Sequence, residues 1–191
     1  MRAFATVRPS WRRMAPGPLA ACAYLAIVVL AAIFADFLSP HDPLKIDPNN
    51  ILAYPNAGHL LGTDELGRDL LARIVYGGRV SLEVAFLAIA LAGTIGVPLG
   101  MVIAFSGRRL ETLAMRLVDV FVSLPEIFVA IVILAFAGGG LTTLIVTIGL
   151  LYFPQFARVA YGMTRSIRAR EHVLSAISLG AGTGWIIRKE I

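Results

Sequence analysis

Titratable side chains are few, and their spacing argues against the common kinds of active site. The histidines His41, His59 and His172 lie on different segments, without metal-ligand spacing. The sequence has no G-x-x-x-x-G-K-[ST], G-x-S-x-G or H-E-x-x-H motif, and GAGTG at 180–184 follows a predicted helix and not a strand. We therefore expect no catalytic residue, no metal site and no cofactor bound by this chain.

Two acidic residues remain as candidates for chemistry because they lie in an apolar run. Asp119 and Glu126 occupy the first half of residues 117–137. Charges inside a membrane are functional candidates by default. Both residues are also near the predicted cytoplasmic end of the run, where they can reach the interface or meet Arg116. Both interpretations stay open.

Long apolar runs must position these residues. Hydrophobic residues make up 58% of the 191 residues and charged residues only 15%, against about 25% charged in a soluble domain. Four runs approach the ~20 residues that a membrane-spanning helix needs: 19–37, 80–105, 117–137 and 141–161. A signal peptide is the alternative interpretation of the first run, but the run is long for a signal peptide and is followed by a poor cleavage site. The single cysteine, Cys22, allows no internal disulfide.

The polar segments between the runs set the expected topology. Residues 38–79 are turn-rich, with an amphipathic, interfacial stretch at 64–76, and residues 106–116 form a short charged link. With the N-terminus inside, the cytoplasmic parts 1–18, 106–116 and 162–191 carry 12 of the 17 Lys and Arg residues. This bias follows the positive-inside rule and predicts a cytoplasmic N-terminus and tail.

A ridge of small residues follows one face of the second run. It recurs at every fourth position and contains a GxxxG pattern. Helices in lipid associate through close backbone approach, so the ridge predicts a packing face. Pro98 is expected to kink or loosen this helix. The ridge residues are Ala88, Ala92, Gly96, Gly100 and Ala104.

The tail contains an amphipathic helix that is too short and too polar to span. Its apolar face is formed largely by small residues, and glycines at 180, 182 and 184 allow a sharp turn after it. Such a helix can lie on lipid or fit a groove in a partner. Nearby arginines suit lipid, whereas small side chains suit close protein contact. The face consists of Val173, Ala176, Ile177, Gly180 and Ala181.

Two stretches resemble a known family. Residues 59–82, HLLGTDELGRDLLARIVYGGRVSL, closely resemble the GTD-x-x-GRD signature of bacterial ABC-importer permeases, and in particular the C-type subunit of dipeptide, oligopeptide and nickel importers. Residues 156–187 resemble the cytoplasmic coupling segment of that family, and 115–125 fit its third span. The signature residues are Gly62, Thr63, Asp64, Gly67, Arg68 and Asp69.

The resemblance implies an all-α, polytopic transmembrane bundle in the bacterial inner membrane, with about four of six spans present. It implies a second homologous permease subunit, two cytoplasmic ATPase subunits that bind ATP and Mg²⁺, and an extracytoplasmic substrate-binding protein. It implies no nucleic-acid partner. The coupling helix at about 168–184 would dock on an ATPase. The implied coupling residues are Glu171, Val173, Ala176, Ile177, Gly180 and Ala181.

The sequence departs from the family pattern at two places. The motif glutamate is replaced by Leu174, and Glu171 lies a helical turn earlier. Family members continue into Leu-Pro and further spans, typically two, beyond the point where this chain stops. We expect residues 1–60 to hold the basic N-terminus, first span and start of the extracytoplasmic segment, and 61–191 an incomplete permease domain. The alternatives are a truncated, non-functional fragment and a small structural membrane protein that oligomerises through its Ala/Gly ridge.

Overall fold

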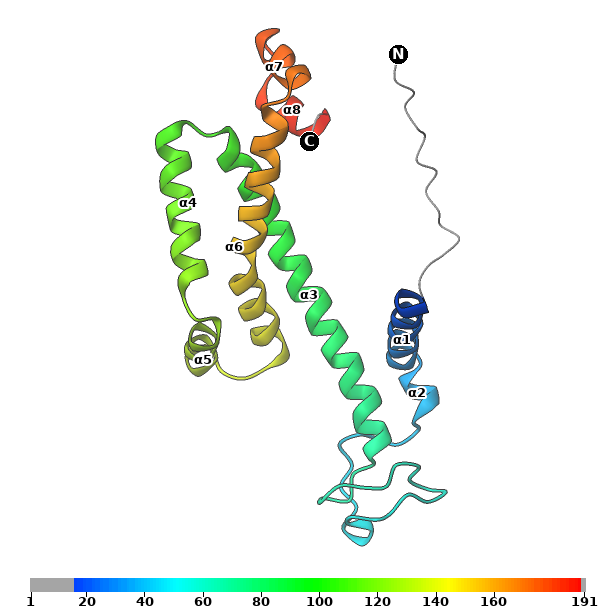
Figure 1. Cartoon of the computed structure of the whole chain (residues 1–191). Coiled ribbons are helices and arrows are strands. Elements are labelled where there is room, and N and C mark those ends of the chain that lie inside the picture. Colours follow the sequence, from blue (N-terminus) through cyan, green and yellow to red (C-terminus); the bar gives the residue numbers. More distant parts are fainter. Residues whose placement is uncertain (1–15, 190–191) are drawn as a thin grey trace. The chain divides into compact units, whose positions relative to one another are not determined.

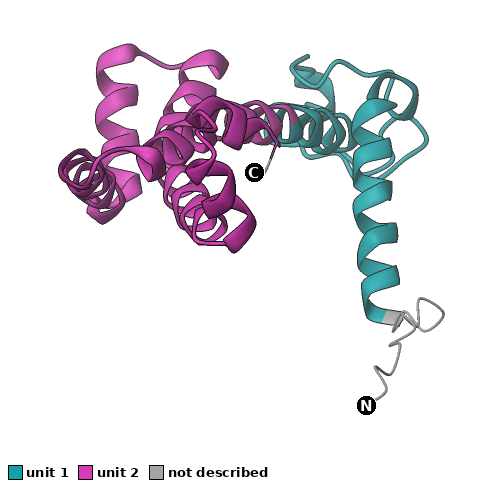
Figure 2. Ribbon diagram, turned by 90° about the horizontal axis from the view of Figure 1, so that it is seen from above, with its two compact units in different colours: residues 1–82 teal, residues 83–191 magenta. Residues whose placement is uncertain are grey.

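A computed structural model describes residues 16–189, and within that range it contains helices and no β-strand, only an isolated bridge between Thr63 and Asp69. The all-α prediction is confirmed. Figure 1 shows the helices in chain order. The chain forms two compact units, residues 1–82 and 83–191, and the division falls inside one long helix (Figure 2).

The first unit contains α1 (Pro16–Ile33), α2 (Ala35–Leu38), the short 3-10 helix η1 (Pro48–Asn50) and the start of α3 (Leu70–Phe105). Large apolar side chains of α1 are exposed along the helix, as suits a segment surrounded by lipid. Asp36 in α2 accepts a hydrogen bond of 2.7 Å from the Tyr76 hydroxyl and lies 3.5 Å from the Arg79 guanidinium. These contacts bring the two ends of the intervening loop together.

The second unit continues α3 and adds α4 (Arg108–Ser123), α5 (Glu126–Ala137), α6 (Leu141–Arg168), α7 (Glu171–Ser178) and α8 (Thr183–Lys189). Helix α6 packs against both α4 and α5. Gly138 and Gly140 separate α5 from α6 and have φ values of 82° and 150°, which other residues rarely adopt. A three-glycine turn therefore reverses the chain between these helices.

Two described helices, α3 and α6, are each long and apolar enough to cross a membrane. Helices α4 and α5 make a third if they are one broken span, and they meet at an angle of 85°. The first expected span corresponds to α1, of which Gly17–Ile33 is a shorter apolar helix. Both α3 and α6 continue through an internal proline, Pro98 and Pro154 respectively.

Two expectations about helix boundaries are wrong. The charged link 106–116 is mostly helical, because α4 already begins at Arg108 after Gly107, whose backbone is extended. The stretch 64–76 is not a separate interfacial helix, since residues 64–69 form a turn and α3 begins at Leu70. Helical spacing of apolar residues in 64–69 was therefore misleading, because local hydrogen bonds to Asp64 hold this part in a turn.

Candidate functional site

The signature residues form a compact loop whose polar groups satisfy one another. The Asp64 carboxylate accepts hydrogen bonds from the backbone amides of Leu66 and Arg68, both at 2.9 Å, and from the Arg68 Nε at 2.8 Å. It also pairs with Arg73. Burial alone would raise the pKa of Asp64, but the hydrogen bonds from Arg68 and Leu66 hold it well below its ordinary value. Asp64 is therefore the centre of the turn.

Two signature glycines are required by the backbone. Gly62 and Gly67 have φ values of 78° and 75°. A methyl group on Gly62 would lie 2.4 Å from the Ala53 carbonyl oxygen, and one on Gly67 only 1.9 Å from the Asp47 carbonyl oxygen. No side chain fits at such distances, so both glycines let the signature loop press directly against residues 47–53.

The other two signature side chains fasten this loop to its neighbours. The Thr63 hydroxyl accepts a hydrogen bond of 2.8 Å from the Ala53 amide and donates to the Asn50 carbonyl. Asp69 precedes α3 and caps it by accepting a 2.7 Å hydrogen bond from the Ala72 amide. The structure thus brings all six signature residues into one loop at the start of α3, where each is explained by a contact within the chain.

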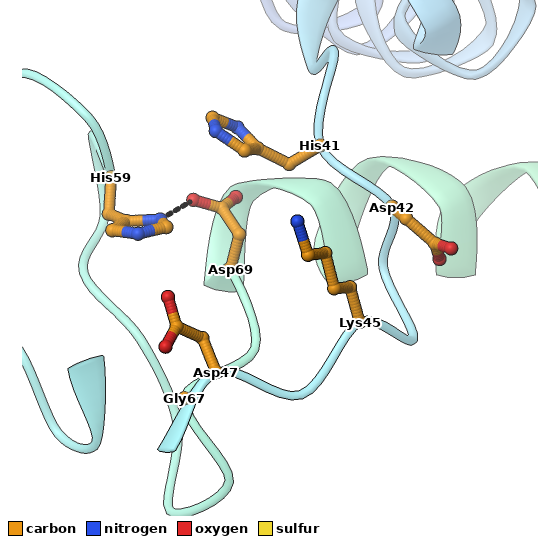
Figure 3. Close-up of a pocket in the computed structure, with 7 residues that line it drawn as sticks. All are labelled: His41, Asp42, Lys45, Asp47, His59, Gly67 and Asp69. Atoms are coloured by element: carbon orange, nitrogen blue, oxygen red, sulfur yellow. Dashed lines mark hydrogen bonds and ion pairs between the residues drawn. The ribbon is translucent and has the colours of Figure 1, made fainter. Parts of the chain in front are cut away.

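A small polar cavity lies beside this loop, with a volume of about 190 Å³. Figure 3 shows His41, His59, Asp69 and Lys45 pointing toward one another there. His59 Nδ1 is 2.8 Å from Asp69 Oδ2, and the His41 and His59 ring centres are 5.3 Å apart. Burial acts to raise the pKa of Asp69, but hydrogen bonds from the Ala72 amide and His59 lower it. Sequence spacing gave no sign that the two histidines meet.

Residues 16–189 hold no group of three or more His, Cys, Asp or Glu side chains arranged to bind a metal ion. The cavity beside the signature loop pairs two histidines with one close carboxylate, and Asp42, Asp47 and Lys45 complete its lining. Asp47 is engaged elsewhere, by hydrogen bonds from Asn50 and the Asn49 amide that lower its pKa. These contacts support a folded loop.

The small-residue ridge lies on the buried side of α3. All five of its members, Ala88, Ala92, Gly96, Gly100 and Ala104, are buried. A methyl group on Gly96 would lie 2.4 Å from the Phe153 carbonyl oxygen, and one on Gly100 2.2 Å from the Ala157 carbonyl oxygen. At these positions the backbones of α3 and α6 approach as closely as glycine permits.

The predicted coupling residues are divided between the inside and the outside of the α7–α8 segment, residues 170–189. Val173 is fully buried, Ala176 and Ala181 are half-buried, and Glu171, Ile177 and Gly180 are exposed. Gly180 has a φ of 87° and ends α7. Its amide donates to the Ile177 carbonyl, and the Ala181 amide donates to the Ala176 carbonyl. The sharp turn predicted here is present.

Four large apolar side chains of this segment are exposed: Ile177 of the predicted face, at 37%, and three others that lie outside that face. Leu174 is 50% exposed, Leu179 90% and Trp185 51%. By contrast Ile186 of α8 is buried together with Val173 of α7. The structure therefore points to Val173 as an anchor for the segment and to the exposed side chains as its available apolar surface.

Asp119 and Glu126 make contacts that sequence reasoning missed. Asp119 pairs with Arg158 of α6, not with Arg116. Glu126 accepts a hydrogen bond of 3.0 Å from the Gln155 amide group. The available signal was the spacing: acids seven residues apart share a helical face, as do Gln155 and Arg158 three residues apart. Only the fold could bring the two faces together.

Comparison with known proteins places the chain among transport proteins. Residues 96–191 match the family described as binding-protein-dependent transport system inner membrane component, and residues 11–56 match the N-terminal TM domain of oligopeptide transport permease C. The chain is 35% identical over 184 residues, 95% of its length, to the dipeptide transport system permease protein DppC of Bacillus subtilis (strain 168).

Relatives named for the transport of other solutes have similar sequence identity to the chain. The chain is 32% identical over 187 residues to the glutathione transport system permease protein GsiD of Pectobacterium atrosepticum and 34% identical over 158 residues to the nickel transport system permease protein NikC of Escherichia coli (strain K12). Those matches cover 96% and 83% of the chain. The matched regions make up only 57% to 62% of these three relatives.

The matches cover both units, and the fold beneath them is an all-α arrangement with helices that can cross a membrane. The GTD-x-x-GRD loop and the segment that follows α6 are the parts whose sequence first indicated this relationship. The chain belongs to the family of inner membrane components of binding-protein-dependent transport systems, and within it the chain is similar to permeases named for dipeptide and nickel transport.

Proposed function

We propose that the chain is a permease subunit of an ATP-driven importer for peptides or related small solutes, with nickel among the candidates. In this proposal it catalyses no reaction, and it couples the motion of ATPase subunits to alternating access of a transport pathway. ATP and Mg²⁺ bind to two partner ATPases, a second permease completes the pathway, and an extracytoplasmic protein delivers the solute. The solute classes come from the names of the relatives.

The observation that carries the proposal is the exposed apolar surface of the α7–α8 segment, residues 170–189. Leu174, Leu179 and Trp185 are exposed on a segment that is held in place by the buried side chains Val173 and Ile186. Leu179, 90% exposed at the end of α7 and next to the Gly180 turn, suits insertion into a groove of a partner protein. Helix α7 is also too short to span a membrane.

Contacts at the end of α6 support a mechanical role. Arg168, the last residue of α6, donates a hydrogen bond of 2.7 Å to the Ala104 carbonyl near the end of α3, and its guanidinium carbon lies 5.1 Å from the centre of the Phe105 ring. The carbonyl would otherwise lack a helical partner. Only Ala169 and Arg170 separate Arg168 from α7. A displacement of α7 would therefore act on both α6 and α3.

A second set of contacts extends this connection to α4. Glu111 in the first turn of α4 accepts a hydrogen bond of 2.5 Å from the Tyr161 hydroxyl, and the Arg165 guanidinium lies 3.3 Å from the same carboxylate. Arg165 also donates to the Tyr161 hydroxyl at 2.7 Å. Three helices are thus joined at the end from which α7 emerges, and we infer that this end faces the cytoplasm.

Co-purification with the ATPase encoded alongside this chain tests the proposal. We expect Leu179→Arg to reduce ATPase recovery about tenfold, because an exposed anchor is replaced by a charge at the contact. Leu60→Arg is the matched control, since Leu60 is 65% exposed on the extracytoplasmic loop. Recovery that is equal for Leu179→Arg, Leu60→Arg and the parent would refute docking through this surface, and no recovery with the parent would refute the importer assignment itself.

A further inference from the structure

Polar side chains form a cluster between α6 and the α4–α5 break. Its members are Asp119, Glu126, Gln155 and Arg158, joined as the pairs Asp119–Arg158 and Glu126–Gln155. Arg158 is ten residues from the end of α6, roughly 15 Å at the helical rise of ~1.5 Å per residue, and about 26 Å from its start at Leu141. Arg158 therefore lies inside α6, three residues before the end of the apolar run 141–161.

The cluster is paired but not covered by this chain. Asp119 retains 57% of its side-chain exposure and Arg158 retains 48%, and Glu126 and Gln155 are also exposed. Contact between charged groups and the hydrocarbon of a bilayer has a high free-energy cost. We therefore expect the exposed surface of the cluster to face water, solute or protein. Two carboxylates, one guanidinium and one amide give it both hydrogen-bond donors and acceptors.

The helix break beside the cluster points in the same direction. Helix α4 ends at Ser123 and α5 begins at Glu126, with an 85° bend through Leu124 and Pro125. Non-helical backbone at membrane depth is tolerated where it lines a water-filled cavity or is buried in protein. Broken helices of this kind place backbone groups at the solute sites of transporters.

We propose that Asp119, Glu126, Gln155 and Arg158 form a solute-contact site in the transport pathway, suited to short zwitterionic peptides. This inference rests on the proposed function. The ammonium group of the peptide would meet the carboxylates of Asp119 and Glu126, and its carboxylate would meet Arg158 and the Gln155 amide group. When a zwitterion binds, its positive and negative ends replace the partners that the charged side chains have in each other. No unpaired charge is therefore created as the peptide passes.

Cysteine accessibility tests the site in membranes that contain the chain with its second permease and ATPase subunits. The background is Cys22→Ser, which removes the single native cysteine. Gln155→Cys is probed with a membrane-impermeant, positively charged thiol reagent, with and without dialanine. Leu150→Cys is the control, because Leu150 is 42% exposed on α6 but lies roughly 140° around the helix at 3.6 residues per turn.

We expect Gln155→Cys to react about tenfold faster than Leu150→Cys, because the reactive thiolate needs water. Dialanine should slow the reaction severalfold, and adding Asp119→Asn and Arg158→Gln should abolish that protection while leaving the thiol accessible. Val159→Cys gives a second probe if Gln155→Cys impairs folding, since Val159 is 62% exposed one helical turn along the same side.

Two results would overturn the inference. A thiol that reacts no faster than the Leu150→Cys control would mean that another chain or lipid covers the cluster. A reactive thiol that dialanine does not protect, or protects equally after both charge substitutions, would mean that the cluster does not contact the peptide. Recovery of the ATPase from the same membranes separates these outcomes from failure of the proposed function, because that recovery does not depend on the cluster.

Discussion

The signature loop and the α7–α8 segment differ in where their distinctive residues are directed. In the loop, residues 59–69, the polar groups of Thr63, Asp64 and Asp69 are satisfied within the chain, and Gly62 and Gly67 allow close backbone contact. In the segment, residues 170–189, Leu174, Leu179 and Trp185 are directed outward. The most recognisable motif is thus explained by folding, whereas the less distinctive segment carries the surface that we propose for a partner.

Replacing Gly67 should have the largest effect on this contrast. Gly67→Ala would place a methyl group 1.9 Å from the Asp47 carbonyl oxygen at a φ of 75°. We expect the loop to lose about 3 kcal/mol or more of stability from backbone strain and the clash. Rapid proteolytic cleavage within 39–69 would report this loss.

Gly78→Ala provides the control for that measurement, because Gly78 lies in α3 with nothing within 4 Å of the added methyl group. Alanine in a helix interior should be neutral or stabilise by about 0.5–1 kcal/mol. Equal cleavage of Gly67→Ala and Gly78→Ala would show that the loop does not depend on close packing against residue 47.

Asp64→Asn should loosen the loop and change its response to pH. Because its folded pKa lies below the unfolded value of about 3.9, the stability contributed by Asp64 is present above that value and is lost as the pH falls through the folded pKa. We expect Asp64→Asn to lower hydrogen-exchange protection of the Leu66 and Arg68 amides at pH 7 and to weaken the further loss below about pH 4.

Glu65→Gln removes a neighbouring carboxylate that is exposed, so it should leave the protection of the same amides unchanged. Asp69 and Asp47 also have lowered pKa values, and they are expected to maintain some acid sensitivity in every variant. Unchanged protection in Asp64→Asn at pH 7 would contradict the central position assigned to this carboxylate.

In the α7–α8 segment, burial should decide which substitutions affect stability. Val173→Ala removes two methyl groups from a fully buried side chain and should destabilise α7 by about 2 kcal/mol. Leu179→Ala, at a side chain that is 90% exposed, should change stability by about 0.5 kcal/mol or less. Hydrogen exchange across 171–189 measures both, and the reverse order would mean that the segment packs through its other side.

Gly180→Ala should have a smaller destabilising effect than Val173→Ala. The positive φ of 87° opposes a side chain, although nothing lies within 4 Å of the added methyl group. We expect a cost of about 1 kcal/mol, seen as faster exchange at the end of α7. Gly182→Ala, which has open space and no positive φ, should exchange as the parent does. Equal effects at both positions would remove the special role given to the Gly180 turn.

Local sequence patterns predicted the helices better than the contacts between them. The apolar runs indicated α3, α5 and α6, and the glycines at 138–140 and 180 marked the turns. The 85° bend at Pro125 was not predictable, because a proline permits a break without fixing its angle. The start of α4 at Arg108 was missed because charge was taken as the sign of a link.

Spacing in the sequence could not predict which distant residues make contact. Asp119 and Arg158 are 39 residues apart, and Glu126 and Gln155 are 29 apart. His41 and His59 are 18 residues apart in the chain, yet their ring centres lie 5.3 Å from each other. The division of the amphipathic tail into a buried Val173 and an exposed Leu179 also depends on the rest of the chain, since a helical wheel shows faces but not what covers them.

The contact of Asp36 with Tyr76 and Arg79 has a consequence for how the loop between α2 and α3 can vary in length. It closes a loop of about 40 residues near its base, so the chain entropy of closure, about 3 kcal/mol plus a constant, has already been lost. Doubling the loop length would add only ~0.6 kcal/mol to this cost. Insertions in the exposed stretch before residue 47 should therefore be tolerated. The loop can change in length while the contact between α2 and α3 is kept.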